Sequence, residues 1–233
     1  MNFANANSKS IVLGVALALL MAGAAFGGAL TSGLHLDEDH SRDSHQNELL
    51  DSIVLDGSDL SRADFTGTSF VGASFDVSIN TGNNTNLDRA ILDGTDLTGA
   101  TFVGANASRV SAVGATAIAT DWSGADLNRT DFSGANLTLV IFDPFTDLTR
   151  TDFLNANLVA ATLNGVDLSG ALNLGTANLT GATYNLATVL PTGFDPLAAG
   201  MVLPEPSHAL LLITGIGGLA AFNRKIKATR PTS

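Results

Sequence analysis

The sequence predicts an all-β solenoid with four sides to each turn, and the first reason is a five-residue repeat. From Leu55 onward an apolar residue recurs at every fifth position, as in Leu55, Leu60 and Phe65. A period of five matches neither the 3.6-residue turn of an α-helix nor the two-residue alternation of a β-strand. It indicates short sides, each made of one repeat, that wind around a common core.

The second reason is a longer period of four repeats. Several arginines lie two residues after a repeat centre, and most are four repeats apart; they are Arg62, Arg89, Arg109, Arg129 and Arg150. The same frame aligns a second set, Phe75, Phe102, Trp122, Phe142, Leu163 and Tyr184. With four sides per turn, each set stacks into a column. We call the first set the arginine column and expect it on the surface, and we expect the second set inside.

The residues around each centre carry a resemblance to a known family. A small residue often lies two positions before the centre and Asp or Asn directly before it, as in Ala125-Asp126-Leu127. This pattern resembles the pentapeptide-repeat family over residues 53–190. The resemblance implies a right-handed quadrilateral β-helix, here of about six coils. We predict that residues 76–86 bulge outward as a loop, because counting them as one side keeps Arg62 and Phe75 in their columns.

The first thirty residues are typical of a secretory signal peptide. Lys9 precedes an apolar run at residues 11–21, and Ala22-Gly23-Ala24 offers a cleavage site for signal peptidase. We therefore interpret residues 1–30 as an export signal whose hydrophobic part is helical.

Residues 31–52 combine histidines with acidic residues. His35, His40 and His45 lie among aspartates and glutamates. We interpret this segment as a solvated linker that leads into an N-terminal cap, since a solenoid end must be covered. The alternative is a divalent-metal site. It is less favoured because five-residue spacing does not place the histidines on one helical face.

The C-terminal end has the order of a sorting signal. A proline-containing linker over residues 191–202 leads to Pro204-Glu205-Pro206, an uncharged run at 209–222, and then Arg224 and Lys225. An apolar run followed by positive charge is typical of a transmembrane segment. Residues 203–233 resemble the PEP-CTERM signal of Gram-negative bacteria. The resemblance implies transient membrane insertion and an exosortase-type protease as partner, with delivery to the cell surface or the exopolysaccharide matrix.

Composition excludes several functions. Between residues 37 and 205, six arginines face all 22 acidic residues, a net charge of −16, which disfavours a nucleic-acid partner. The chain has no cysteine, and residues 49–190 contain no histidine or lysine. The repeat aspartates fall at outward positions, where no cleft raises a carboxyl pKa for acid–base work. We therefore expect neither catalytic residues nor a cofactor.

The function predicted from these features is that of an exported, non-enzymatic surface or matrix protein that presents a rigid acidic solenoid. Its partners would be an exopolysaccharide or a surface protein. The arginine column has two interpretations: ion pairs with Asp64, Asp131 and Asp152, which we prefer, or a ladder of guanidinium groups for an acidic polymer or another chain. The alternative function is a DNA mimic that binds a topoisomerase-like partner.

Overall fold

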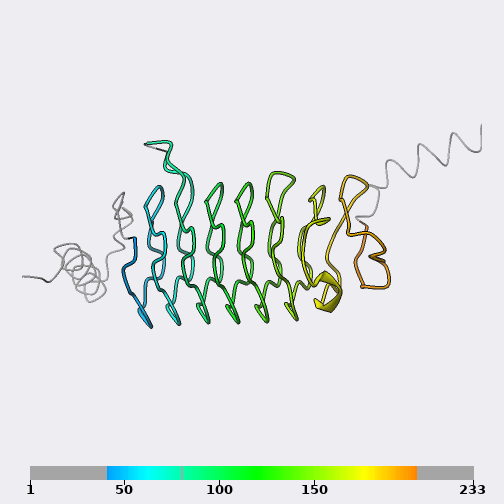
Figure 1. Cartoon of the computed structure of the whole chain (residues 1–233), viewed down its shortest axis with the longest axis horizontal. Coiled ribbons are helices and arrows are strands. Elements are labelled where there is room, and N and C mark those ends of the chain that lie inside the picture. Colours follow the sequence, from blue (N-terminus) through cyan, green and yellow to red (C-terminus); the bar gives the residue numbers. More distant parts are fainter. Residues whose placement is uncertain (1–40, 80, 204–233) are drawn as a thin grey trace, which may run out of the picture. The chain divides into compact units, whose positions relative to one another are not determined.

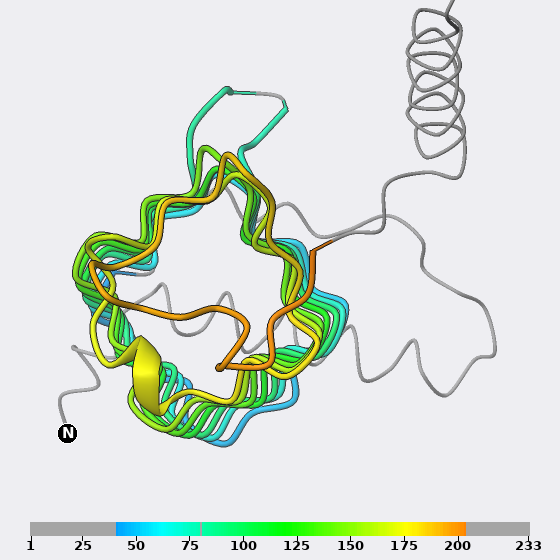
Figure 2. The ribbon, with the colours of Figure 1, turned by 90° about the vertical axis from the view of Figure 1, so that its right-hand side faces the viewer.

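The computed structural model describes residues 41–79 and 81–203 and shows a stack of four-sided coils (Figures 1 and 2). The chain divides into two compact units, Met1–Val202 and Leu203–Ser233, and Leu203 is the described residue of the second unit. Among the described residues the one helix is the short 3₁₀ helix η1 (Leu174–Thr176). The strands are single-residue parallel bridges between successive coils.

Parallel bridges align each side of one coil with the same side of the next. One column of bridged residues runs Ser44, Asp64, Ile91, Ser111, Asp131, Asp152 and Leu172. Another runs Val54, Ser74, Thr101, Asp121, Ile141, Thr162, Thr183 and Val202. Steps of 20 or 21 residues dominate these columns, which is the period expected from four sides of five residues. The four-sided coil predicted from the sequence is therefore present.

A tight turn joins each side to the next. The amide N–H of the residue three positions after a centre donates to the carbonyl oxygen of that centre, as from Ala63 to Leu60 at 3.1 Å. The residue between them at the second position after the centre has a positive φ, about 60–70° in Arg62, Gly67 and Gly72. A single positive φ at that position is the geometry of a type II turn, which favours glycine. Glycine occupies this position at about half of the corners, and arginine, asparagine, serine, alanine or leucine at the others.

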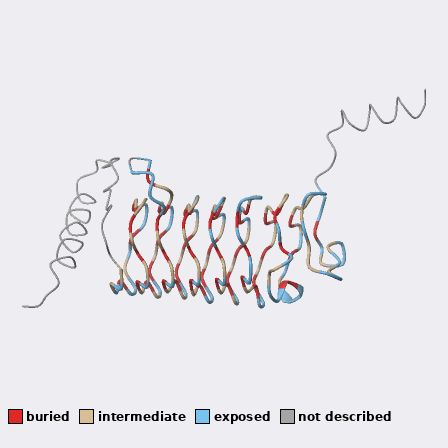
Figure 3. Ribbon diagram, turned by 45° about the horizontal axis from the view of Figure 1, so that its top comes forward, coloured by how far each residue is buried: buried red, intermediate tan, exposed pale blue. Residues whose placement is uncertain are grey.

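The core is built from the centres and the small residues two positions before them (Figure 3). Phe75, Phe102 and Trp122 stack face to face, with ring centroids 4.6 and 3.8 Å apart, as the predicted aromatic column requires. Phe142 departs from that stack and packs edge-on against Phe153. Where the small residue is threonine, its hydroxyl donates to a main-chain carbonyl, as from Thr130 to Ala107 at 2.6 Å. Buried hydroxyls therefore have partners inside an otherwise apolar core.

The coil extends beyond both boundaries that the sequence indicated. The bridges from Ser44 and Leu49 to the following coil place residues 44–52 in the solenoid, where a linker and cap were expected. The bridge between Thr183 and Val202 and the bond from the Gly181 amide to Gly200 place the end of the predicted linker at 191–202 against the last coil. The N-terminal boundary was wrong because a histidine occupies a centre there. The C-terminal boundary was wrong because prolines and glycines form the final turns.

Three extra stretches of chain lie at one corner, directly after the aromatic column. They are residues 76–85, 143–146 and 185–188. The first projects outward as the predicted loop (Figure 2), and Asn86 still bridges to Asp59 in the previous coil. Each stretch ends in a threonine whose hydroxyl donates to a carbonyl of the previous coil: Thr85 to Leu55, Thr146 to Trp122 and Thr188 to Leu163, at 3.2, 3.0 and 2.9 Å. We call this corner the insertion corner.

The extra residue in the stretch 185–188 changes which residue after Tyr184 is a repeat centre. Counting in fives from Tyr184 makes Val189 a centre, but Val189 bridges to Asp167 and is 48% exposed. Leu190 therefore occupies the inward position, packed against the core. Thr188 lies two residues before it, as Thr146 lies two residues before Leu148. This threonine is the sequence signal that could have placed the centre correctly.

We predict that Trp122→Ala lowers the free energy of unfolding by about 3–5 kcal/mol, because it removes a fully buried indole from a stack that cannot close. Trp122→Phe retains a ring and is expected to cost about 1–2 kcal/mol. Denaturant unfolding monitored by circular dichroism measures both. A loss below about 1 kcal/mol for the alanine variant would contradict the packing described here.

Candidate arginine-column binding surface

The aspartates and asparagines of the repeat serve the turns. The side-chain Oδ1 of the residue before a centre accepts a hydrogen bond from the main-chain N–H two residues later. Thr66 donates to Asp64 at 3.0 Å and Asn128 donates to Asp126 at 2.9 Å. The same bond occurs at Asp59, Asn86, Asp96, Asn106, Asp121, Asp131, Asn136, Asp147, Asp152, Asp167 and Asn178. Many of the surface aspartates are therefore accounted for by the hydrogen bonding of the turns.

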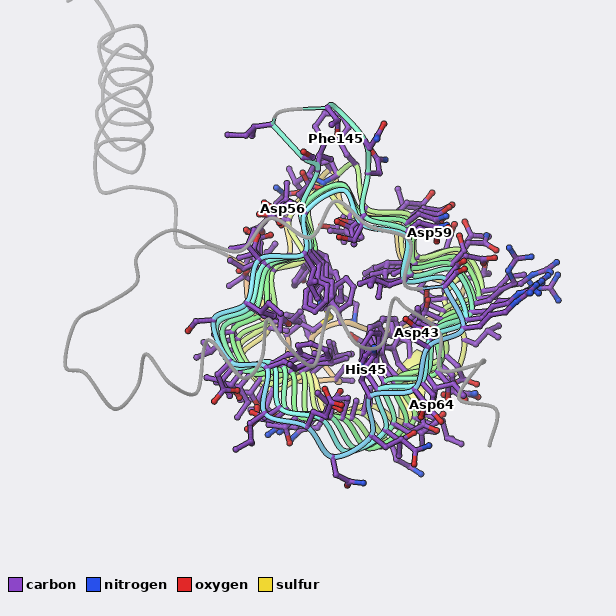
Figure 4. All side chains as sticks on the ribbon, turned by 90° about the vertical axis from the view of Figure 1, so that its left-hand side faces the viewer. Asp43, His45, Asp56, Asp59, Asp64 and Phe145 are labelled. Carbon is purple, nitrogen blue, oxygen red and sulfur yellow. The ribbon has the colours of Figure 1, made fainter. Side chains whose placement is uncertain are left out.

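These hydrogen bonds also affect ionisation. The hydroxyl of Thr66, followed by its amide, lowers the pKa of Asp64, and the hydroxyl and amide of Ser169 lower the pKa of Asp167. A lowered pKa keeps these turn carboxylates charged. In Figure 4, Asp59 and Asp64 point away from the coil interior.

The arginines predicted to form a column lie at one corner of the coil. From Arg62 to Arg129, each arginine amide donates to the carbonyl oxygen of the residue that precedes the next arginine, as from Arg89 to Ser108 at 3.0 Å and from Arg109 to Asn128 at 2.9 Å. Arg62, Arg89, Arg109, Arg129 and Arg150 are thus stacked, and Gly170 follows Arg150. A row of side chains with nitrogen at their tips projects from one side of the coil in Figure 4.

Arg42 is a sixth member that the sequence reasoning missed. Its amide donates to Ser61 at 3.0 Å, and its φ of 66° matches that of the other arginines. The missed signal is the phase of the histidines, because His40 and His45 continue the five-residue spacing of Leu50 and Leu55. Arg42 therefore follows its centre at the same distance as Arg62 follows Leu60. From here on the arginine column includes Arg42.

Most of the column does not form the ion pairs that we preferred from the sequence. Arg109 contacts Asp88 of the previous coil, with Nη2 2.6 Å and Nε 2.8 Å from Oδ1, and Arg89 lies 4.0 Å from the same carboxylate. Within residues 41–79 and 81–203, Arg62, Arg129 and Arg150 form no ion pair. The expected pairs with Asp64, Asp131 and Asp152 were wrong: each of these carboxylates accepts a bond from its own turn amide at Oδ1, and none lies within ion-pair distance of a described arginine.

A shallow hollow of about 260 Å³ lies on the column. Its walls are Ser108, Arg109, Asp126, Asn128, Arg129 and Asp147. The two guanidinium groups are donors, and the two aspartates and two neutral polar side chains supply acceptors. Such a mixture suits a ligand that carries both negative charge and hydroxyl groups.

His45 belongs to the core. The side chain is 6% exposed, stacks on Phe65 with ring centroids 5.5 Å apart, and points into the coil in Figure 4. Its Nδ1 lies 3.4 Å from Glu48 Oε2. His35 and His40 lie outside the described residues. Within the described part of the chain, no group of three or more ligating side chains is arranged for a metal ion.

The predicted sorting residues, Pro204, Glu205, Pro206, Arg224 and Lys225, also lie outside the described residues, as do residues 1–30 and the two predicted hydrophobic helices. In the part of the chain that the structure describes, no helix is long and apolar enough to cross a membrane.

Comparison with known families decides the identity of the solenoid. The family described as pentapeptide repeats matches in eight copies, at residues 50–76, 83–116, 108–143 and 145–181, which together cover more than half of the chain. The chain belongs to the pentapeptide-repeat family. The fold of that family is the right-handed quadrilateral β-helix, which agrees with the coils described above. Pentapeptide-repeat proteins are generally non-enzymatic structural or DNA-mimic proteins.

Solved structures of other pentapeptide-repeat proteins are similar to this chain. One from the cyanobacterium Nostoc is 30% identical, covering 51% of this chain and 84% of its own, with a TM-score of 0.38. QnrB1, a plasmid-mediated fluoroquinolone resistance protein, is 23% identical, with 78% and 95% covered and a TM-score of 0.42. HetL of Nostoc, a protein involved in heterocyst differentiation regulation, is 21% identical, with 78% and 90% covered and a TM-score of 0.32. No curated protein matches the chain.

The insertion corner of this pentapeptide-repeat protein carries the exposed apolar side chains of the extra stretches. Ile79 is 92% exposed, Phe145 82% and Leu186 100%. Figure 4 shows Phe145 at the corner from which the outward loop projects. The insertion corner and the arginine column therefore flank the same side of the coil, the side with Asn86 and Asn106 on its outer surface.

Asp76 begins the first insertion and differs from the other aspartates. Desolvation by burial raises the pKa of Asp76 above the ordinary 3.8, although hydrogen bonds from the Val103 amide and the Thr101 hydroxyl oppose the rise. The charge of Asp56 adds to it. The folded state therefore holds the Asp76 proton more tightly than the unfolded state.

We predict opposite pH dependences for two substitutions. The stability of the wild type relative to Asp76→Asn should fall as pH rises from 3.8 through the raised pKa, because the folded state then loses a proton that it binds more tightly. Relative to Asp167→Asn, whose parent pKa is lowered, the stability should rise as pH increases from below 3.8. Denaturant unfolding at several pH values measures both, and slopes of equal sign would contradict the assignment.

Proposed function

We propose that this pentapeptide-repeat protein is exported and acts at the cell surface or in the extracellular matrix as a non-enzymatic binding scaffold. Its solenoid presents regularly spaced side chains to a polymer or protein partner. A protease of the exosortase type processes it at Pro204-Glu205-Pro206. The observation that carries the binding role is the arginine column, in which Arg62, Arg129 and Arg150 form no ion pair with any described residue.

The proposed location is supported by the two ends of the sequence. Lys9, the apolar run at 11–21 and Ala22-Gly23-Ala24 have the order of a signal peptide. Pro204-Glu205-Pro206, the run at 209–222 and the following basic residues have the order of a sorting tail. Processing at both ends leaves the solenoid as the mature protein.

A non-enzymatic role is supported by how the described polar residues are used. Most repeat aspartates accept hydrogen bonds from turn amides, and the interior is filled by leucine, phenylalanine and alanine. The two carboxylates of the hollow, Asp126 and Asp147, accept hydrogen bonds from the amides of their own turns. Binding, not chemistry, is what this surface supports.

The second candidate is a DNA mimic that binds a topoisomerase-like partner. The outward columns of aspartate and asparagine favour it, because they place negative charge at regular intervals. The arginine column opposes it, since six guanidinium groups interrupt the acidic surface along one whole corner. A cytosolic location would be required, and both ends of the sequence favour export instead.

We expect mass spectrometry of the protein from membrane and extracellular fractions of its host to show cleavage near Ala24 and near Pro204-Glu205-Pro206. Replacing Pro204, Glu205 and Pro206 with alanine should abolish the C-terminal cleavage and leave the N-terminal cleavage intact. An uncleaved chain in the cytosol would overturn the proposal and favour the DNA-mimic role.

A further inference from the structure

The backbone of the arginine column does not call for arginine. Each of its six members has a φ between 59° and 66°. A left-handed conformation costs a residue with a Cβ atom about 1–2 kcal/mol, and glycine avoids that cost. Glycine does occupy the equivalent turn position at other corners, as at Gly94, Gly114 and Gly134. Turn geometry therefore explains the aspartates but not the arginines.

Neighbouring side chains do not explain the arginines either. Asp88 binds Arg109 and approaches Arg89, whose side chains are still 42% and 46% exposed. Arg62, Arg129 and Arg150 are exposed and form no ion pair with any of residues 41–79 and 81–203. Because a guanidinium group carries five fixed donors, this corner offers many unused donors to solvent.

The spacing of these donors fits an extended chain. Successive coils lie about 4.8 Å apart, so the column repeats its charge at that interval along the solenoid axis. From Arg42 to Arg150 it spans about 24 Å. The interval of about 4.8 Å between neighbouring arginines is close to the length of one sugar unit in an extended polysaccharide. A polymer lying parallel to the axis would therefore meet one arginine per unit.

The composition of the hollow selects among anionic polymers. Arg109 and Arg129 can donate to a carboxylate, while Asp126 and Asp147 use their Oδ1 atoms for their own turns and accept no described bond at Oδ2. Those Oδ2 atoms are acceptors for sugar hydroxyls. A phosphodiester group has no hydroxyl to donate to these Oδ2 atoms, so beside a phosphate chain the same carboxylates would only repel.

We propose that the arginine column binds a carboxylated polysaccharide laid along the solenoid axis, with uronate carboxylates on the arginines and sugar hydroxyls on Asp126 and Asp147. This inference rests on the proposed surface function and names the ligand class. Each exposed contact is weak, so binding depends on many contacts made at once. Affinity should therefore rise with chain length until the polymer spans the column.

The test uses the full chain and polygalacturonate, a homopolymer of uronic acid, in affinity electrophoresis and calorimetry. The double substitution Arg109→Gly and Arg129→Gly removes the two guanidinium groups of the hollow at positions whose backbone favours glycine. Folding should be retained, with the thermal midpoint unchanged or raised. We expect the dissociation constant to increase by about tenfold.

The matched control is Leu139→Glu with Ile118→Glu. These substitutions also change the net charge by −2. They lie at the corner opposite the arginine column, where the Ala119 amide donates to the Thr138 carbonyl and the Leu139 amide to the Val159 carbonyl. Binding should fall much less than in the arginine variant. Equal losses in the two variants would overturn the proposal, since general repulsion would then account for both.

Other ligands complete the test. Neutral dextran should bind at least about tenfold more weakly than polygalacturonate, and galacturonate oligomers should gain affinity with length. Equal binding of dextran, no length dependence, or tighter binding of single-stranded DNA would each overturn the carboxylated-polysaccharide assignment. The outcome is separate from that of the processing experiment, because a correctly cleaved, exported chain that fails to bind polygalacturonate rejects the ligand class alone.

Discussion

The coil-to-coil hydrogen bonding of the main chain determines the rest of this structure. Because every side of a coil bonds to the same side of the next, a residue is fixed in a column as soon as its place in the repeat is known. Inward columns must fill the core, and outward columns form stripes parallel to the axis. Because outward residues form stripes, a ligand that lies along the solenoid is expected to contact several members of one stripe. A single substitution then changes only one of those contacts.

This constraint separates residues that the fold requires from residues that it does not. An aspartate or asparagine before a centre commonly accepts a hydrogen bond from a turn amide. The third residue of each turn must adopt a positive φ, for which glycine is best suited. Arginine at that place meets no requirement of the turn. The acidic coat is thus largely a consequence of the fold, whereas the arginine column is an addition to it.

The sequence predicted the parts of the fold that depend on side-chain size. The centres, the four-sided coil, the outward loop at 76–86 and the stacking of Phe75, Phe102 and Trp122 all follow from where large and small residues recur. The errors arose where polarity hid the phase. His45 occupies a centre although it is polar, which delayed the predicted start of the coil and left Arg42 out of its column. Thr188 and Leu190 were misassigned because Val189 is also apolar.

The candidate site could be predicted in position but not in pairing. Periodicity places Arg62 to Arg150 in one column, since it fixes their main-chain positions. It cannot fix which carboxylate a flexible guanidinium group reaches. Asp64, Asp131 and Asp152 are close in sequence, but none of them forms an ion pair with a described arginine. Asp88, in the coil before Arg109, was the carboxylate in reach.

The position of the insertions preserves the column. The three extra stretches at residues 76–85, 143–146 and 185–188 lie at the insertion corner, and each ends in a threonine that bonds back to the previous coil. The chain thus returns to register before the next side begins. If an insertion of the same length lay at the arginine corner, it would displace a guanidinium group and break the spacing of about 4.8 Å. From Arg42 to Arg150 no such break occurs, and a ligand that reads that spacing meets an uninterrupted ladder.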